Sequence, residues 1–586
     1  MDTSRKNNSQ FGIYFLAFAL ALFIRLLRLG ELPLGDVEAA WAMRALDVSR
    51  GLNPVLGVQP AYVNLTGLAF FLFQASNFTA RLVPALFGAF LCLLPFKFRD
   101  ILGSKPAFVM AFLLALDPGF LATSRLAGSP ILAVTTFLLA WSAWRSRNYP
   151  VAGVWVGIAL LSGPSLWAGL LGLVLASGLQ RVLPVSNEDE DYAADGDQVS
   201  IELANPGRAI PDGKTWMSLV AYALGSYVLV GSLFLLVSGG LGSGLAAIPA
   251  YFSSWFAPIN ENLTSIPVTQ LLLALLGYES PLLAVGVVAL VRGIIVRDGR
   301  VMRLGLWLIT ALVLTFANPS RQVMDLIWVL IPMIGLAAVE ISHHLSSAEE
   351  GTWETYGMAI FTSSILIFMM LNFAAIALVP MDPAALQLRW WILVGSLALL
   401  IISIAMVGFG WSPSIALQGS AWGTLIVLFV LMLSAATASG GLRTYRTFEL
   451  WPQGTFPGQV STLVDQMNDL SRWHEGVNTV LDVTIAGVDS PALLWALRDW
   501  HPAVLPDVNL SGSAPSVVIA SDQFSSTEIE STYRGQDLSW RVTPLWTQGL
   551  LTDWLKWSLM HEFPTRDEKI ILWVRSDVFI DAQNGK

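Results

Sequence analysis

The sequence predicts an all-α, polytopic membrane bundle that carries a small C-terminal α/β domain. Its 586 residues are 54% hydrophobic and only 13% charged, whereas soluble globular domains carry about 25% charged residues. Long windows such as Trp216–Val237 and Met358–Val379 contain no charge, and each is long enough to cross a hydrocarbon core of about 30 Å. After Gly440 the sequence changes to short strand-like and helical segments, so we expect the bundle to end there.

The apolar windows predict about thirteen transmembrane spans. Their expected boundaries, good to a few residues, are 11–28, 79–97, 106–123, 130–144, 150–163, 165–180, 215–237, 267–291, 303–317, 323–341, 355–379, 389–409 and 419–438. Segment 61–75 is apolar but short, contains Asn64 and Gln74 and starts after Pro60. We expect it to lie in the outer interface, within a first outer loop of residues 30–77.

The distribution of basic residues predicts the orientation, because short cytoplasmic loops carry an excess of Lys and Arg. With the N-terminus in the cytoplasm, alternate loops hold the basic residues Lys97, Arg99, Lys105, Arg145, Arg147, Arg181, Arg208, Lys214, Arg292, Arg297, Arg300 and Arg303. An odd number of spans then places the C-terminal domain outside the cell. The sequence therefore predicts a multi-pass plasma membrane protein with a cytoplasmic N-terminus.

Two domains are expected, a membrane domain of residues 1–439 and an extracytoplasmic domain of residues 440–586. Within the first, residues 182–214 form a cytoplasmic linker whose run Asn187–Asp197 holds six acidic residues. The single cysteine, Cys92, lies in an apolar segment, so an intrachain disulfide is excluded.

The C-terminal domain alternates strand and helix signals, which is typical of a small α/β fold. Strands are expected at 480–485, 516–520 and 570–574, and helices at 490–500, capped by Ser490, and at 551–560. Its many tryptophans are interpreted as core packing, with a sugar-stacking surface as the alternative.

The first outer loop contains two carboxylates, Asp36 and Glu38, at the start of an amphipathic segment just after a span. One interpretation is structural: Asp36 caps the helix, and Glu38 lies in the first turn, where the helix dipole favours a negative charge. The functional interpretation is a general base that removes a proton from an acceptor hydroxyl.

Two arginines occur at corresponding depths in other outer connections. Arg125 lies in the turn Thr123–Pro130, and Arg321 follows Asn318-Pro-Ser. Because arginine binds phosphate oxygens bidentately, both are candidates for holding a lipid-linked phosphate. Arg321 and Asp325 are spaced i, i+4, so a local ion pair is the alternative for Arg321.

These features together resemble the GT-C superfamily of membrane glycosyltransferases, close to its protein O-mannosyltransferase and aminoarabinose transferase branch. The resemblance covers the first ~180 residues best. The matching parts are the Asp36 and Glu38 pair, the interfacial helix after Gln59-Pro60, the segment Ala80–Gly88 (ARLVPALFG), the Ser124-Arg125 turn and the soluble C-terminal domain.

The resemblance implies an inverting transfer of sugar from a polyprenyl-phosphate donor on the outer side. Asp36 would be the base and Glu38 its neighbour, and the arginines would stabilise the departing phosphate. The expected substrate-binding residues are Arg125, Arg321, Trp41, Gln59, Arg81 and Ser129. The chain departs from many relatives in two places, since Val37 separates the acidic pair and Ser129 stands where an acidic residue is common.

The expected partners are a lipid-linked sugar donor, an acceptor that is a glycan, protein or lipid, and membrane lipids. No basic stripe indicates nucleic acid. The histidines lack ligand spacing and predict no metal site; Asp36 and Glu38 could hold a divalent cation, although two carboxylates do not complete a site. A flippase or transporter component and a non-catalytic lipid- or glycan-binding scaffold are the alternative functions.

Overall fold

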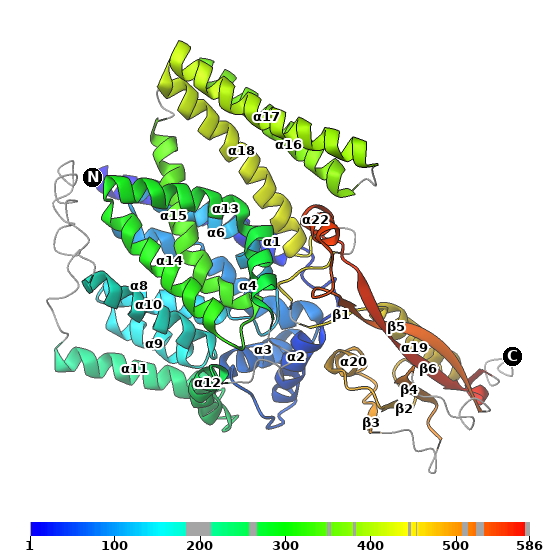
Figure 1. The fold of residues 1–586 in the computed structure, drawn as a ribbon. Coiled ribbons are helices and arrows are strands. Elements are labelled where there is room, and N and C mark those ends of the chain that lie inside the picture. The colour runs from blue at the N-terminus through cyan, green and yellow to red at the C-terminus, as the bar shows by residue number, and fades with distance from the viewer. Residues whose placement is uncertain are drawn as a thin grey trace.

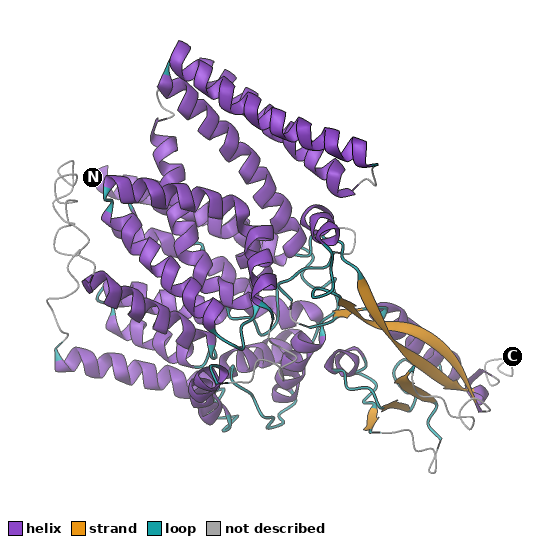
Figure 2. Cartoon of the chain, viewed as in Figure 1, coloured by secondary structure: helices purple, strands orange, loops and turns teal. Residues whose placement is uncertain are grey.

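The computed structural model describes residues 2–182, 212–256, 266–347, 353–378, 382–443, 447–452, 454–506, 514–522 and 532–579. The acidic run Asn187–Asp197, and with it nearly all of the expected linker 182–214, lies outside the described residues. Figure 1 shows a large helical bundle that contacts a smaller sheet domain through the region of α2 and α20. Strands are confined to that second domain (Figure 2).

The bundle is built from α-helices. They are α1 (Asp2–Leu26), α2 (Asp36–Ser49), α3 (Pro60–Phe73), α4 (Asn77–Leu91), α5 (Arg99–Leu102), α6 (Ser104–Leu116), α7 (Pro118–Ser124), α8 (Ile131–Arg145), α9 (Tyr149–Leu160), α10 (Ser165–Val182), α11 (Gly213–Gly231), α12 (Gly240–Ser254), α13 (Val268–Val296), α14 (Gly299–Ala317), α15 (Ile327–Ser347), α16 (Trp353–Leu378), α17 (Pro383–Gly410) and α18 (Pro413–Ser439), with 3-10 helices η1 (Leu94–Phe98) and η4 (Val323–Leu326).

All thirteen predicted spans fall on helices, and the chain is a multi-pass membrane protein. Within the described residues, eight helices are long and apolar enough to cross a membrane, or nine if one bent pair is a single span. The remaining four predicted spans fall on shorter apolar parts of α1, α8 and α9 and on α11. The straight span expected at 106–123 is wrong: α6 and α7 meet at 55°, because Asp117 caps a new helix that starts at Pro118.

The last three helices of the bundle, α16, α17 and α18, extend away from the rest (Figure 1). Many of their apolar side chains, above all in α17, are exposed, as expected for helices that face lipid. Glycines allow α18 to approach α16 closely, since a Cβ atom at Gly419 would meet Met358 and one at Gly423 would meet the carbonyl of Ala359. Close approach at small residues is the usual basis of helix packing in membranes.

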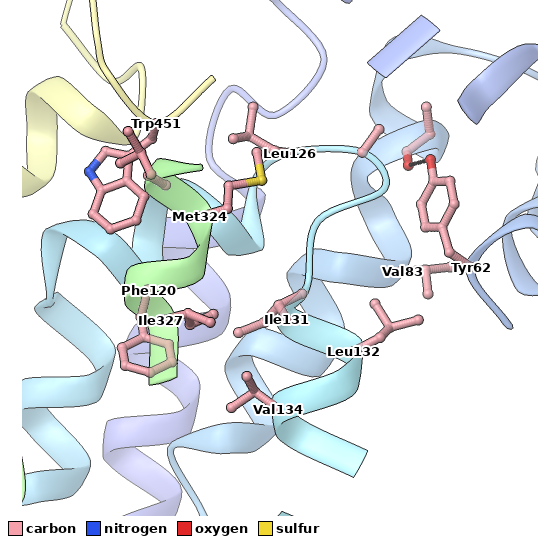
Figure 3. Close-up of a cluster of buried hydrophobic side chains, with 14 of the residues drawn as sticks. Tyr62, Val83, Phe120, Leu126, Ile131, Leu132, Val134, Met324, Ile327 and Trp451 are labelled. Atoms are coloured by element: carbon pink, nitrogen blue, oxygen red, sulfur yellow. Dashed lines mark hydrogen bonds between the residues drawn. The ribbon is translucent and has the colours of Figure 1, made fainter. Parts of the chain in front are cut away.

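The interior of the bundle includes a side chain from the segment that leads into the C-terminal domain. Figure 3 shows Trp451 of that segment in a cluster of buried side chains that also includes Phe120, Ile131 and Ile327. Gly119 leaves room for the indole, since a Cβ there would contact the Trp451 ring. Because burial of a large apolar side chain stabilises by about 1.5–3 kcal/mol, this contact helps to fix the second domain on the first.

The C-terminal domain contains a six-stranded mixed sheet with the order β1-β5-β6-β4-β2-β3. Its strands are β1 (Phe456–Pro457), β2 (Val483–Ala486), β3 (Ala503–Leu505), β4 (Val517–Ser521), β5 (Tyr533–Pro544) and β6 (Thr565–Arg575), and its helices are α19 (Val460–Glu475), α20 (Pro491–Ala496) and α22 (Leu551–Met560). β2 is parallel to β3 and β4, whereas β4, β6, β5 and β1 pair antiparallel in turn.

The predicted strands and both predicted helices of this domain are present. Ser490 caps α20 by accepting a hydrogen bond of 3.2 Å from the backbone N–H of Leu493. However, α20 ends at Ala496, so the helix expected over 490–500 is too long. The sequence interpretation missed α19, β1, β3 and β5. Core packing is confirmed for Trp495, Trp500 and Trp540, which are buried.

The two domains meet where α20 packs against α2 and the loop after α3. The indole N–H of Trp495 donates to Asn77 Oδ1 at 2.8 Å, and its ring lies 5.7 Å from that of Phe70. Arg498 donates to the carbonyl of Ala75 at 3.3 Å. The segment expected to be the first outer loop therefore forms much of the surface against which the C-terminal domain packs.

Candidate active site

A cavity of about 770 Å³ lies where the bundle, the first loop and the C-terminal domain meet. It is lined by the segment 28–41, the turn 122–130, α10, α12, the end of α14 and residues 320–328. Residues 439–461, which lead into the C-terminal domain, complete it. Of the predicted site residues, the cavity is lined by Glu38, Trp41, Gln59, Arg81 and Arg125.

The start of α2 determines where the two carboxylates point. Gly35, not Asp36, is the N-cap residue, in an extended conformation with φ −71° and ψ 168°. Glu38 reaches back toward the N–H of Gly35 at 3.5 Å. The capping role considered for Asp36 is therefore wrong; Asp36 is the first residue of the helix, and its side chain faces the C-terminal domain.

Both carboxylate oxygens of Asp36 are occupied by groups from the second domain. Oδ1 accepts from Ser490 Oγ at 2.6 Å and from the N–H of Ala492 at 3.1 Å. Oδ2 accepts from Arg541 Nε at 2.7 Å and from Thr455 Oγ1 at 3.1 Å. Asp36 is not part of the cavity lining.

These contacts also set the protonation of Asp36. Burial alone would raise the pKa of its carboxyl, but the hydrogen bonds from Ser490 and Ala492 and the charge of Arg541 outweigh burial. The pKa therefore lies below its usual value of 3.8. A carboxylate with a lowered pKa is a weaker base than an ordinary one.

Glu38 lines the cavity and forms a buried, bidentate ion pair with Arg81. Arg81 Nε donates to Glu38 Oε1 at 2.8 Å, and Nη2 donates to Oε2 at 2.6 Å. The Glu38 side chain is 12% exposed and the Arg81 side chain is 6% exposed. Arg81 also donates to the carbonyls of Leu29, Leu32 and Pro33, so its guanidinium organises the turn after α1.

The same glutamate fixes the neighbouring turn. The N–H of Ala127 donates to Glu38 Oε1 at 2.9 Å, which connects α2 to the 125–130 turn. Next in that turn, Gly128 has φ +69°, and a Cβ atom there would overlap the ring of Trp41. Glu38, Arg81 and Trp41 therefore shape one wall of the cavity.

Arg125 is buried and lines the cavity. Its Nη1 atom donates to the carbonyls of Ile24, Arg25 and Leu27, at 2.8 to 2.9 Å. Its Nε and Nη2 atoms make no hydrogen bond to any residue that the structure describes. Burial, and then the charges of Arg81, Arg25 and Arg28, lower its pKa to about 10. Of these three arginines, Arg81 and Arg28 are paired with Glu38 and Glu31.

Arg321 and Ser129 are placed differently from Arg125, since neither is among the cavity-lining residues. Arg321 donates to the carbonyls of Ile266, Phe316 and Asn318, and the local ion pair with Asp325 that was considered is not formed. Ser129 is buried, and its hydroxyl has no hydrogen-bond partner in the described part of the chain. Gln59 is the N-cap of α3 and faces the cavity.

Three acidic residues that line the cavity, Glu31, Asp325 and Glu449, were not predicted as site residues. Asp325 lies in η4, where its Oδ2 atom accepts from the N–H of Gln322 at 2.9 Å. Glu449 accepts from the hydroxyl of Tyr278 at 2.7 Å and lies 3.1 Å from His561 Nδ1. The Glu449 cluster joins residues far apart in sequence, so no local pattern reveals it; Asp325 was visible only as a neighbour of Arg321.

Among the described residues, no group of three or more His, Cys, Asp or Glu side chains is arranged to hold a metal ion. Asp36 and Glu38 face different partners, as described above. A divalent cation at this pair stays a prediction.

The sequence matches no protein-family model and no curated protein. The fold matches ArnT from Cupriavidus metallidurans, an aminoarabinose transferase, bound to undecaprenyl phosphate, with a TM-score of 0.52 and 15% identity over 97% of this chain and 99% of that chain. ArnT in the apo state gives a TM-score of 0.51 and 14% identity over 97% and 98%. The Archaeoglobus fulgidus oligosaccharyltransferase in complex with Zn and sulfate gives a TM-score of 0.36 and 13% identity over 87% and 68%. On the evidence of the two ArnT structures, this chain has the fold of ArnT, in agreement with the fold that the resemblance to the GT-C superfamily predicted.

Proposed function

We propose that this protein is an inverting glycosyltransferase that transfers a sugar from a polyprenyl-phosphate donor to an acceptor hydroxyl at the outer face of the plasma membrane. The GT-C fold and the membrane bundle support the general class. The ArnT structure bound to undecaprenyl phosphate supports the kind of donor. A cavity of about 770 Å³ is large enough for a sugar and a phosphate together.

The single observation that carries the proposal is the free edge of Arg125. Its Nη1 atom is held by three carbonyls, which fixes the guanidinium plane. The Nε–Nη2 edge has no partner among the described residues, and this edge can bind two phosphate oxygens at once. Burial and, after it, the nearby arginines lower its pKa, so an anion at this position would stabilise the charge of the buried guanidinium.

In this mechanism the acceptor oxygen attacks the anomeric carbon, and the carrier phosphate leaves. A single displacement inverts the anomeric centre. Arg125 would stabilise the charge that develops on the leaving phosphate, which is the usual contribution of preorganised cationic groups. The buried guanidinium needs little reorganisation to do this, because its orientation is already fixed.

The test is transfer of labelled sugar from a panel of polyprenyl-phosphate sugars to hydroxyl acceptors. We expect turnover with one donor, and we expect Arg125→Lys to lower kcat/KM about 10- to 100-fold, because lysine keeps the charge but loses the bidentate edge. Arg300→Lys, which alters an arginine paired with Asp298 outside the cavity, is the matched control. Carrier phosphate binding without turnover of any donor would identify the non-catalytic scaffold instead.

The proposed orientation has a separate test. Because Cys92 is the only cysteine and is buried, a new surface cysteine can be labelled selectively. Glu475→Cys, at an exposed position on the C-terminal domain, should react in intact cells with a thiol reagent that does not cross membranes. Labelling that requires permeabilised cells would place the domain in the cytoplasm and contradict the proposed topology.

A further inference from the structure

Four carboxylates of the described residues line the cavity, and other side chains hold three of them. Glu31 pairs with Arg28 at 2.6 Å. Glu38 is held by Arg81, by the N–H of Ala127 and more weakly by that of Gly35. Glu449 accepts through Oε2, while its Oε1 atom is fully enclosed and so is out of reach of a substrate. The fourth carboxylate is Asp325.

Asp325 forms no ion pair with a cationic side chain of the described residues. Its Oδ2 atom is anchored by the backbone N–H of Gln322 at 2.9 Å, which holds the side chain in one orientation. Its Oδ1 atom accepts no hydrogen bond from the residues that the structure describes, and it is not sealed from the cavity. Among the cavity acids, Asp325 therefore combines a fixed position with a lone pair that an acceptor hydroxyl can use.

The surrounding wall is suited to an acceptor. Tyr251, whose pKa is raised mainly by burial and also by the nearby Asp325 carboxylate, lines the cavity together with Trp328 and Thr315. Trp328 is itself fixed by a hydrogen bond of 2.9 Å from its indole N–H to Ser165 Oγ. Aromatic faces and a hydroxyl group on rigid helices are groups that hold sugars or other hydroxyl-bearing molecules.

We propose that Asp325 is the general base of the transfer and that the wall formed by Tyr251, Trp328 and Thr315 holds the acceptor. This inference rests on the proposed glycosyl transfer. Asp325 Oδ1 takes the proton from the acceptor hydroxyl as its oxygen forms the bond to the anomeric carbon. The bond from that carbon to the carrier phosphate breaks, and its electron pair leaves with the phosphate toward Arg125. Asp325 then returns the proton to solvent.

The proposal gives Asp36 and Glu38 a different role from the one implied by the resemblance. All four of their oxygens already accept hydrogen bonds from protein groups. A base must have a free lone pair within reach of the proton it abstracts. In this arrangement both residues position other groups: Asp36 holds the C-terminal domain, and Glu38 holds Arg81 and the 125–130 turn.

The experiment compares the purified full-length wild type with Asp325→Asn, Asp325→Glu and the exposed control Asp537→Asn in the labelled-sugar assay. Binding of polyprenyl phosphate and thermal unfolding are measured for each variant. We expect Asp325→Asn to lower kcat by about 10²–10⁴-fold, the typical contribution of a general base, with carrier binding unchanged. Asp325→Glu should restore part of the activity because it restores a carboxylate. Asp537→Asn, whose side chain is 64% exposed, should behave like wild type.

The possible failures are distinguishable. An active wild type with an equally active Asp325→Asn would overturn the role of Asp325 and leave the proposed function standing. A second outcome also overturns the role of Asp325: Asp325→Asn is inactive and has lost carrier binding or stability, and Asp325→Glu is inactive too. Asp325 would then be a structural residue. A folded wild type that turns over no donor overturns both the proposed function and this inference.

Discussion

Asp36 Oδ2 lies 2.7 Å from Arg541 Nε, although 505 positions of the chain separate the two residues. The pair joins the first residue of α2 to the long strand β5 of the C-terminal domain. Glu38, two residues further along α2, lines the cavity. The N-terminus of one helix therefore contacts both the C-terminal domain and the wall of the candidate site.

The Asp36–Arg541 pair predicts a measurable coupling in a double-mutant cycle. Asp36→Asn and Arg541→Gln should each speed hydrogen exchange in α20, and the double variant should resemble the single ones. Because the two side chains are 19% and 22% exposed, we expect a coupling free energy of about 1–2 kcal/mol. Glu568→Gln is the control, since Glu568 lies 3.5 Å from Arg541 and is 52% exposed. Fully additive effects of the two substitutions would show that the pair does not hold the domains together.

The lowered pKa of Asp36 predicts how this docking depends on pH. Its carboxylate contributes stability that is fully present above the usual pKa of 3.8, and this stability is lost as pH falls through the lower pKa of the docked state. We therefore compare the hydrogen-exchange protection of α20 in wild type and Asp36→Asn at equal pH. The difference should stay constant above about pH 5 and shrink below about pH 4. A difference that already disappears between pH 7 and 6 would assign the contact to another titrating group.

The Glu38–Arg81 pair predicts a larger loss of stability. Removing one partner leaves a buried charge without compensation, which typically costs about 3–5 kcal/mol. We expect Glu38→Gln and Arg81→Ala each to cause a clear decrease in the melting temperature of the protein in detergent. The matched control is Lys556→Ala, which breaks an ion pair with Glu562 whose side chains are both 50% exposed and should change the melting temperature little. Similar melting temperatures for the three variants would contradict the structural role of Glu38.

The sequence predicted those parts of the structure that depend on local pattern. The helix at 551–560 and the cap at Ser490 follow from residues that are neighbours in the chain. The amphipathic helix Val460–Glu475 also has a local pattern, with buried residues at Val460, Leu463, Met467 and Leu470, and could have been found. β5 was missed because charged and glycine residues interrupt its alternation at 534–537.

The candidate site was predicted less completely, for a physical reason. Residue type and position indicated which loop would carry the carboxylates, and five of the eight predicted residues do line the cavity. The partners of each carboxylate were not predictable. Ser490 and Arg541 reach Asp36 only after two domains dock, and such contacts leave no periodic signal. The local spacing of Arg321 and Asp325 even favoured an ion pair, whereas nearby backbone groups bind both side chains instead.

Gly128 predicts the sharpest test of the cavity wall. Its φ of +69° is strained for any residue with a Cβ atom, and that atom would also overlap the Trp41 ring. Gly51 has a similar φ of +76°, but a Cβ there would meet nothing within 4 Å. Gly51→Ala should therefore lower the free energy of unfolding by about 1–2 kcal/mol through backbone strain alone. Gly128→Ala should lower it by about 1–3 kcal/mol more, because the added Cβ atom overpacks the site.

The two glycine variants should also differ in function. A displaced Trp41 would move the 125–130 turn, which carries Arg125 and the N–H that binds Glu38. Binding of polyprenyl phosphate, measured at a temperature where both variants are folded, should weaken in Gly128→Ala and remain unchanged in Gly51→Ala. If the two variants lose equal stability and bind the carrier equally, the contact between Gly128 and Trp41 does not shape the cavity, and the position of Arg125 must depend on the carbonyls of α1 and the turn after it alone.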